Sequence, residues 1–115
     1  MDSAFTFYKN TAIAEESSYP YIARYGTSKT SFTTAIPSGG VTGYRDVAGA
    51  SGLACALNHQ PVSVAIEADQ AIFQYYVTGT IASGWGTNLD HAVLAAGYDS
   101  TAGYYLGKNS WKKLE

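Results

Sequence analysis

The sequence predicts an α+β fold, in which a strongly twisted antiparallel sheet forms a partial β-barrel with short helices packed at its ends. Two apolar runs, 89–98 and 104–111, flank a short polar segment, a pattern typical of a β-hairpin. Residues 60–68 alternate apolar and polar side chains, as a half-buried strand does. Shorter stretches, 1–10 and 51–57, place their apolar residues at helical spacing.

The first half of the chain is predicted to contain short elements. Residues 1–10 form a helix whose apolar face packs on the domain. Residues 27–40 are rich in Thr, Ser and Gly and lack periodicity, which indicates a mobile surface loop. A strand is predicted over 40–47, followed by the helix over 51–57. That helix carries Cys55, which we expect to be a buried or half-buried small apolar residue.

The second half contains the clearer signals. In the strand over 60–68 the apolar residues should face the core. Residues 73–76 form an aromatic turn on a short helix that Asp69 opens, and 80–82 are predicted to be a strand. Trp85, between two glycines in the following loop, is expected to anchor that loop.

Composition excludes several classes of function. The chain has 115 residues, a net charge of −2 and seven Lys and Arg, so it offers no basic stripe for nucleic acid. No Gly-rich phosphate loop is present, and no cofactor is predicted. The uncharged span 70–89 contains too many polar residues to cross a membrane. With a single cysteine, no intrachain disulfide can form. We expect one domain over 1–111 and a tail introduced by cloning at 112–115.

His91 and Asn109 form the most suggestive polar pair in the predicted hairpin. Facing residues of an antiparallel pair have a constant index sum, which a turn centred near Ser100 or Thr101 sets at about 201 or 202. The indices of His91 and Asn109 sum to 200, so the two residues should lie within about one pair of direct opposition. We therefore expect the imidazole within hydrogen-bond reach of the carboxamide, with Trp111 nearby. Such a contact is either structural or catalytic.

Sequence detail favours the catalytic alternative. The segments Asp90-His91-Ala92-Val93 and Lys108-Asn109-Ser110-Trp111 resemble the two blocks that carry the catalytic His and Asn of papain-like cysteine peptidases, in a form similar to cathepsin L. The resemblance extends through 1–5, 16–21 and 60–68, in the order and spacing of that family.

The resemblance implies that residues 1–111 are the barrel-like, C-terminal half of such an enzyme. His91 would be the imidazole that takes the proton of a Cys thiol, and Asn109 would fix its tautomer and ring plane. Trp111 would cover the pair from water. Because the block with the nucleophilic Cys is not in the sequence, the chain is expected to be an inactive fragment of an endopeptidase whose N-terminal half is missing.

The resemblance also implies a substrate cleft and a compartment. Leu89, Asp90, Ala92 and Ala65 match positions that line the cleft, and the small Ala65 with the apolar Leu89 would suit a bulky apolar substrate residue. The substrate would be a peptide or protein. The intact relatives are lysosomal or secreted, and this chain carries no targeting signal that we identify.

Other interpretations remain open at this point. The chain could be a non-enzymatic homologue that binds a partner protein through its half-cleft. A metal site from His91 and His59 with acidic residues is a weaker alternative, since the spacing matches no usual ligand pattern. An exposed edge beside the hairpin would favour homo-oligomers formed by strand exchange.

Overall fold

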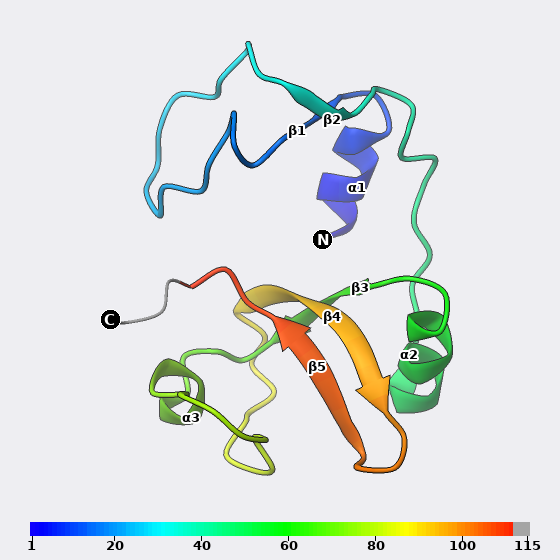
Figure 1. Cartoon of the computed structure of the whole chain (residues 1–115), viewed down its shortest axis with the longest axis vertical. Helices are drawn as coiled ribbons and strands as arrows, with labels where there is room; N and C mark the ends of the chain where they lie inside the picture. The colour runs from blue at the N-terminus through cyan, green and yellow to red at the C-terminus, as the bar shows by residue number, and fades with distance from the viewer. Residues whose placement is uncertain (112–115) are drawn as a thin grey trace. The chain divides into compact units, whose positions relative to one another are not determined.

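The computed structural model describes residues 1–111, and the predicted tail at 112–115 lies outside the described residues (Figure 1). By its internal packing the chain divides into two units, the first spanning Met1–Asp46 and the second beginning at Val47. Whether residues 1–111 act as one domain stays a prediction.

The first unit contains one helix and one pair of short strands. Helix α1 spans Asp2–Tyr8, which confirms the helix predicted over 1–10; Met1 caps it without a side-chain hydrogen bond. Strand β1 (Ile13–Ala14) pairs antiparallel with β2 (Thr34–Ile36), with a register shift between its two residues. No helix within residues 1–111 is long and apolar enough to cross a bilayer.

The strand of the first unit lies earlier than the sequence predicts. Residues 40–47 form no strand, whereas β2 lies inside 27–40, the segment predicted to be a loop. A strand needs a hydrogen-bonded partner, and β1 meets the chain at residues 33–36, where Glu15 N–H donates to the Thr33 carbonyl (2.8 Å). Gly39, at φ +82°, then turns the chain out of β2.

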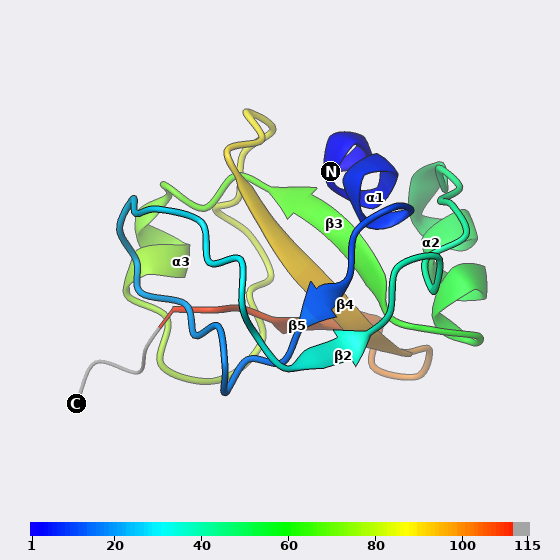
Figure 2. The same ribbon diagram turned by 90° about the horizontal axis from the view of Figure 1, so that it is seen from above.

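The second unit is built on a three-stranded antiparallel sheet. Its strands are β3 (Val62–Ile66), β4 (His91–Asp99) and β5 (Tyr104–Lys108), in the order β3-β4-β5. Helices α2 (Gly49–Leu57) and α3 (Ala71–Gln74) lie at opposite ends of this sheet (Figures 1 and 2). The α+β class is therefore confirmed, and over the described part of the chain the strands form open sheets rather than a closed barrel.

Two further expectations for the second unit are wrong, and one is displaced. Residues 80–82 form no strand; Gly79 and Gly84, both with positive φ, bend the chain on either side of them. Cys55 is exposed. It follows the half-buried Leu53 by two positions, or about 200° around a helix, and so points away from the packed side. Helix α3 begins after Gln70, one residue later than an Asp69 cap implies.

The β4–β5 hairpin has the predicted form with one irregularity. Next to the site Leu94 pairs with Lys108, an index sum of 202, and next to the turn Tyr98 pairs with Tyr105, a sum of 203. A bulge between Ala95 and Gly97 accounts for the change. In the turn, the Asp99 carboxylate accepts hydrogen bonds from the N–H groups of the residues two and three positions later, at 2.9 and 2.8 Å.

Strand β5 has one hydrogen-bonded neighbour in the sheets formed by residues 1–111, and all five of its residues are exposed. An unpaired edge is a template for a second chain. We therefore propose that the chain self-associates through β5, and expect light scattering to show oligomers that grow with concentration. Leu106→Lys, which charges the edge, should shift them to monomer, whereas Val77→Lys, in an exposed position off any strand, should not. A monomer at millimolar concentration would contradict the proposal.

Candidate active site

His91 and Asn109 are brought together by the hairpin. His91 is the first residue of β4 and pairs across the sheet with Ile66 of β3, while Asn109 directly follows β5. Their side chains form a hydrogen bond, with His91 Nε2 2.9 Å from Asn109 Oδ1. The predicted contact across the hairpin is confirmed in its geometry. It spans 18 positions in sequence, so only the hairpin register produces it.

The carboxamide of Asn109 is oriented by the backbone N–H of the next residue. The Ser110 N–H donates to Asn109 Oδ1 at 2.8 Å, so this end of the amide must be the oxygen, which only accepts. Because Oδ1 cannot donate, the hydrogen on the His91 bond must lie on Nε2. In the neutral ring Nδ1 is then the unprotonated nitrogen, free to accept a proton.

Trp111 lies against the imidazole. The two ring centroids are 5.1 Å apart and the planes differ by 31°, which confirms the expectation that Trp111 is near the pair. The indole still exposes 43% of its surface, and His91 is half-buried. The indole thus shields one side of the ring and leaves the pair partly open to solvent.

The residues predicted to line a substrate cleft flank this pair. Ala65 and Ala92 are direct Cα partners across β3 and β4, so their side chains share one face of the sheet. Leu89 is 63% exposed just before β4. The carboxylate of Asp90 is occupied within the chain, because it accepts hydrogen bonds from the N–H groups of Ala68 (2.7 Å) and Asp69 (3.3 Å). Contact of these residues with substrate stays a prediction.

Sequence reasoning missed two participants. Ser110 acts through its backbone N–H, for which the residue type gives no signal. Glu67 follows β3 directly, is half-buried, and accepts hydrogen bonds from the Gln70 side chain and the Asn88 N–H. A half-buried carboxylate at the end of an apolar strand needs partners, so its position in the sequence was a signal that could have been used.

The sole cysteine lies away from the imidazole within the second unit. Helix α2 leads into the Val62 end of β3, whereas His91 pairs with the Ile66 end. The start of α2 is tied to the turn half of the hairpin, where Tyr105 hydroxyl donates to the Ala50 carbonyl (2.9 Å). In the part of the chain that the structure describes, no three His, Cys, Asp or Glu residues gather in a way that could hold a metal ion.

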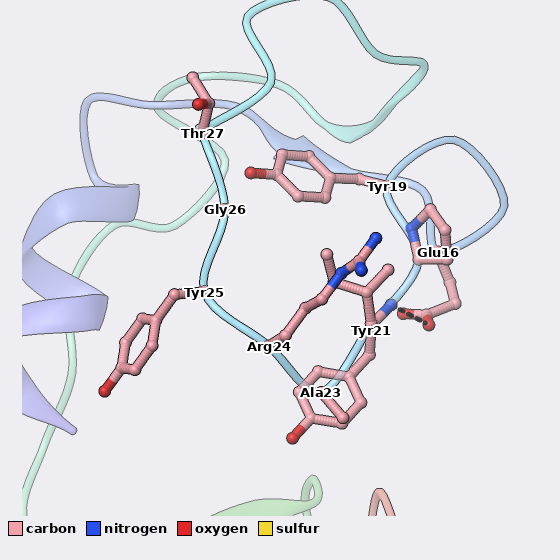
Figure 3. Close-up of a pocket in the computed structure, with 10 residues that line it drawn as sticks. Glu16, Tyr19, Tyr21, Ala23, Arg24, Tyr25, Gly26 and Thr27 are labelled. Atoms are coloured by element: carbon pink, nitrogen blue, oxygen red, sulfur yellow. Dashed lines mark hydrogen bonds between the residues drawn. The ribbon is translucent and has the colours of Figure 1, made fainter.

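A hollow of about 400 Å³ lies in the first unit and contains none of the predicted site residues. Residues 19–27 curve around it, and Glu16 accepts a hydrogen bond from the Tyr21 N–H (3.2 Å), drawn dashed in Figure 3. Tyr25 points outward from the loop and is fully exposed. The residues that line the hollow include no imidazole or thiol that could act as base or nucleophile. The hairpin pair is the better candidate active site.

Comparison with known proteins assigns the chain to a family. The family model described as papain family cysteine protease matches residues 1–114. The chain belongs to the papain family of cysteine proteases. Among curated papain-family relatives, it is 44% identical to germination-specific cysteine protease 1 of Arabidopsis thaliana and 40% identical to cysteine endopeptidase Rep1 of Oryza sativa subsp. japonica. Each match covers 96% of this chain but 31% and 32% of the relative, so the chain spans about a third of their length.

A solved papain-family structure is similar as well. The chain matches the bromelain protease from Ananas comosus, solved in complex with the E64 inhibitor, with a TM-score of 0.64 and 34% identity. The match covers 96% of this chain and 53% of the bromelain chain. The resemblance inferred from the two sequence blocks is thereby confirmed at the level of family and fold.

Proposed function

We propose that this chain supplies the catalytic His and Asn of a papain-family cysteine endopeptidase that hydrolyses peptide bonds. The observation that carries the proposal is the 2.9 Å hydrogen bond from His91 Nε2 to Asn109 Oδ1, which leaves Nδ1 as the proton-accepting nitrogen. Trp111 also covers one side of the His91 ring. A purely structural His–Asn contact would not need this cover, whereas a proton-transferring imidazole benefits from it. Membership of a family of cysteine proteases supports the same role.

In the proposed reaction His91 Nδ1 takes the proton of a cysteine thiol, and the thiolate attacks the substrate carbonyl to form a thioester. The imidazolium then gives that proton to the leaving amine, and water completes hydrolysis. Asn109 keeps the ring plane and tautomer through both transfers. Cys55 is on α2 at the other end of the sheet, so the nucleophile is proposed to come from a part of the enzyme outside these 115 residues.

The proposed substrate is a peptide or protein with a bulky apolar residue near the scissile bond. Exposed Leu89 offers apolar surface, while the small side chains of Ala65 and Ala92 leave room on the face they share. By family resemblance, we propose a lysosomal or secreted setting for the whole enzyme.

The test compares this chain alone with a hybrid in which it replaces the aligned segment of the bromelain chain. The chain alone should not cleave a fluorogenic Phe-Arg peptide under reducing conditions, because no thiol faces His91. The hybrid should cleave it, since the remainder of the bromelain chain supplies the nucleophile. Turnover by the chain alone that alkylation of Cys55 abolishes would overturn the first expectation. An inactive but folded hybrid would count against the proposed function.

A further inference from the structure

The segment just before His91 is held by two carboxylates. Asp90 reaches from that segment to the N–H groups of Ala68 and Asp69, and its own N–H donates to the Ile66 carbonyl at 3.1 Å. Glu67 reaches the other way, from the end of β3 to the Asn88 N–H. Both carboxylates therefore join the same two segments, 67–69 and 88–90.

Glu67 occupies space that a side chain would otherwise need. A Cβ built on Gly86 would overlap both oxygens and the carboxyl carbon of Glu67, so the carboxylate lies directly against the Gly86 backbone. One Glu67 oxygen accepts from Gln70 Nε2 (2.6 Å) and the other from the Asn88 N–H. Both neighbours are donors, so each of the two Glu67 oxygens acts as an acceptor in these contacts.

We propose that Glu67 is a positioning residue that seats 86–89, and with it Leu89, beside Asp90 and His91. Leu89 has no anchor of its own in the described contacts; it is 63% exposed and follows Asn88, whose N–H is the tied group. The proposal rests on the proposed peptidase function for its kinetic consequence, because Leu89 is the apolar surface offered to substrate. Its structural part can be tested without activity.

The structural test uses amide hydrogen exchange on the 115-residue chain. Glu67→Ala should speed exchange of the Asn88 amide by about tenfold or more, the loss expected for a hydrogen bond to a charged group. Gly86→Ala should do the same, since the new methyl displaces the carboxylate. The Gly103 amide, bonded to the Asp99 carbonyl in the hairpin turn, should be unchanged and reports an intact turn. Unchanged exchange at Asn88 in Glu67→Ala would overturn the proposal.

Variants at Asp69 and Glu67 distinguish the specific hydrogen bond to Asn88 from a general loss of negative charge. Asp69→Asn removes a carboxylate that accepts from the same Gln70 side chain (2.9 Å) but does not bond the Asn88 N–H, so Asn88 exchange should not change. Glu67→Gln leaves one oxygen for two donors and should behave like Glu67→Ala. Adding Gln70→Glu restores the balance, because the new amide can donate to residue 70 and accept from Asn88. Failure of this double variant to recover protection would contradict the assignment.

The kinetic test uses the bromelain hybrid. Glu67→Ala should raise KM roughly tenfold for a peptide with a bulky apolar residue, with kcat within about twofold, because the His91–Asn109 bond is not touched. The Glu67→Gln/Gln70→Glu double variant should recover KM. Lost Asn88 protection with unchanged KM would overturn the role in seating Leu89. If the unsubstituted hybrid is inactive, the proposed function fails while amide exchange still decides whether Glu67 holds the segment.

Discussion

His91→Ala in the bromelain hybrid is expected to lower kcat/KM by about 10³-fold or more. The imidazole is the one group proposed to move protons in both halves of the reaction, and alanine offers no substitute. The fold should persist, because His91 joins β4 through its backbone pairing with Ile66. The measurement is kcat/KM on the fluorogenic peptide, together with the rate at which iodoacetamide alkylates the hybrid's nucleophilic cysteine at mildly acidic pH. That rate should also fall, since the thiolate loses its cationic partner.

The chain contains a matched control for this variant. His59, the second histidine, is exposed in the segment after α2 and takes no part in the proposed site. His59→Ala should leave kcat/KM and the alkylation rate within about twofold of the unsubstituted hybrid. If His59→Ala were as damaging as His91→Ala, the loss would reflect folding, and the assigned role of His91 would have no support.

Asn109→Ala should lower kcat by roughly 10- to 100-fold, the loss expected for one hydrogen bond to a group that becomes charged. Without Oδ1 the ring can rotate and either nitrogen can carry the proton, so only a fraction of molecules present Nδ1 correctly. Asn109→Asp keeps an oxygen that accepts from both Ser110 N–H and His91 Nε2, and it should retain more activity than the alanine variant.

The measurement is kcat for the two Asn109 variants and for a control, Asn58→Ala. Asn58 is an exposed asparagine at the end of α2. Asn58→Ala should behave like the unsubstituted hybrid. An alanine variant of Asn109 with full kcat, or an aspartate variant slower than alanine, would show that the carboxamide oxygen does not orient the ring.

Much of the hairpin could be predicted from sequence because its register is local. The turn length sets which residues face one another, and the index sum of 202 near the site lies in the predicted range. The bulge at Ala96 was not predicted, although Gly97, a glycine inside the strand, is a local signal for one. The predicted contact between His91 and Asn109 holds because, on their side of the bulge, the index sum is 202, which is within the predicted range.

The elements that sequence reasoning placed wrongly depend on partners distant in the chain. Residues 40–47 and 80–82 have strand-like composition, but a strand exists only where another segment supplies its hydrogen bonds. The position of Glu67 after an apolar strand signals a carboxylate that needs partners, but it does not reveal that one partner is a backbone N–H 21 positions away. The pattern of apolar and polar residues indicates which face of an element is buried, but it carries little information on hydrogen bonds between distant segments.

Asn109 Oδ1 accepts from both Ser110 N–H and His91 Nε2, and this shared acceptor determines which nitrogen of the imidazole can react. With Nε2 capped by the carboxamide, the imidazole presents its lone pair along one axis only, from Nδ1. An electrophile that approaches the ring should therefore react at Nδ1. The Ser110 N–H sets this preference before any reagent or substrate binds, because it fixes which end of the Asn109 amide is the oxygen.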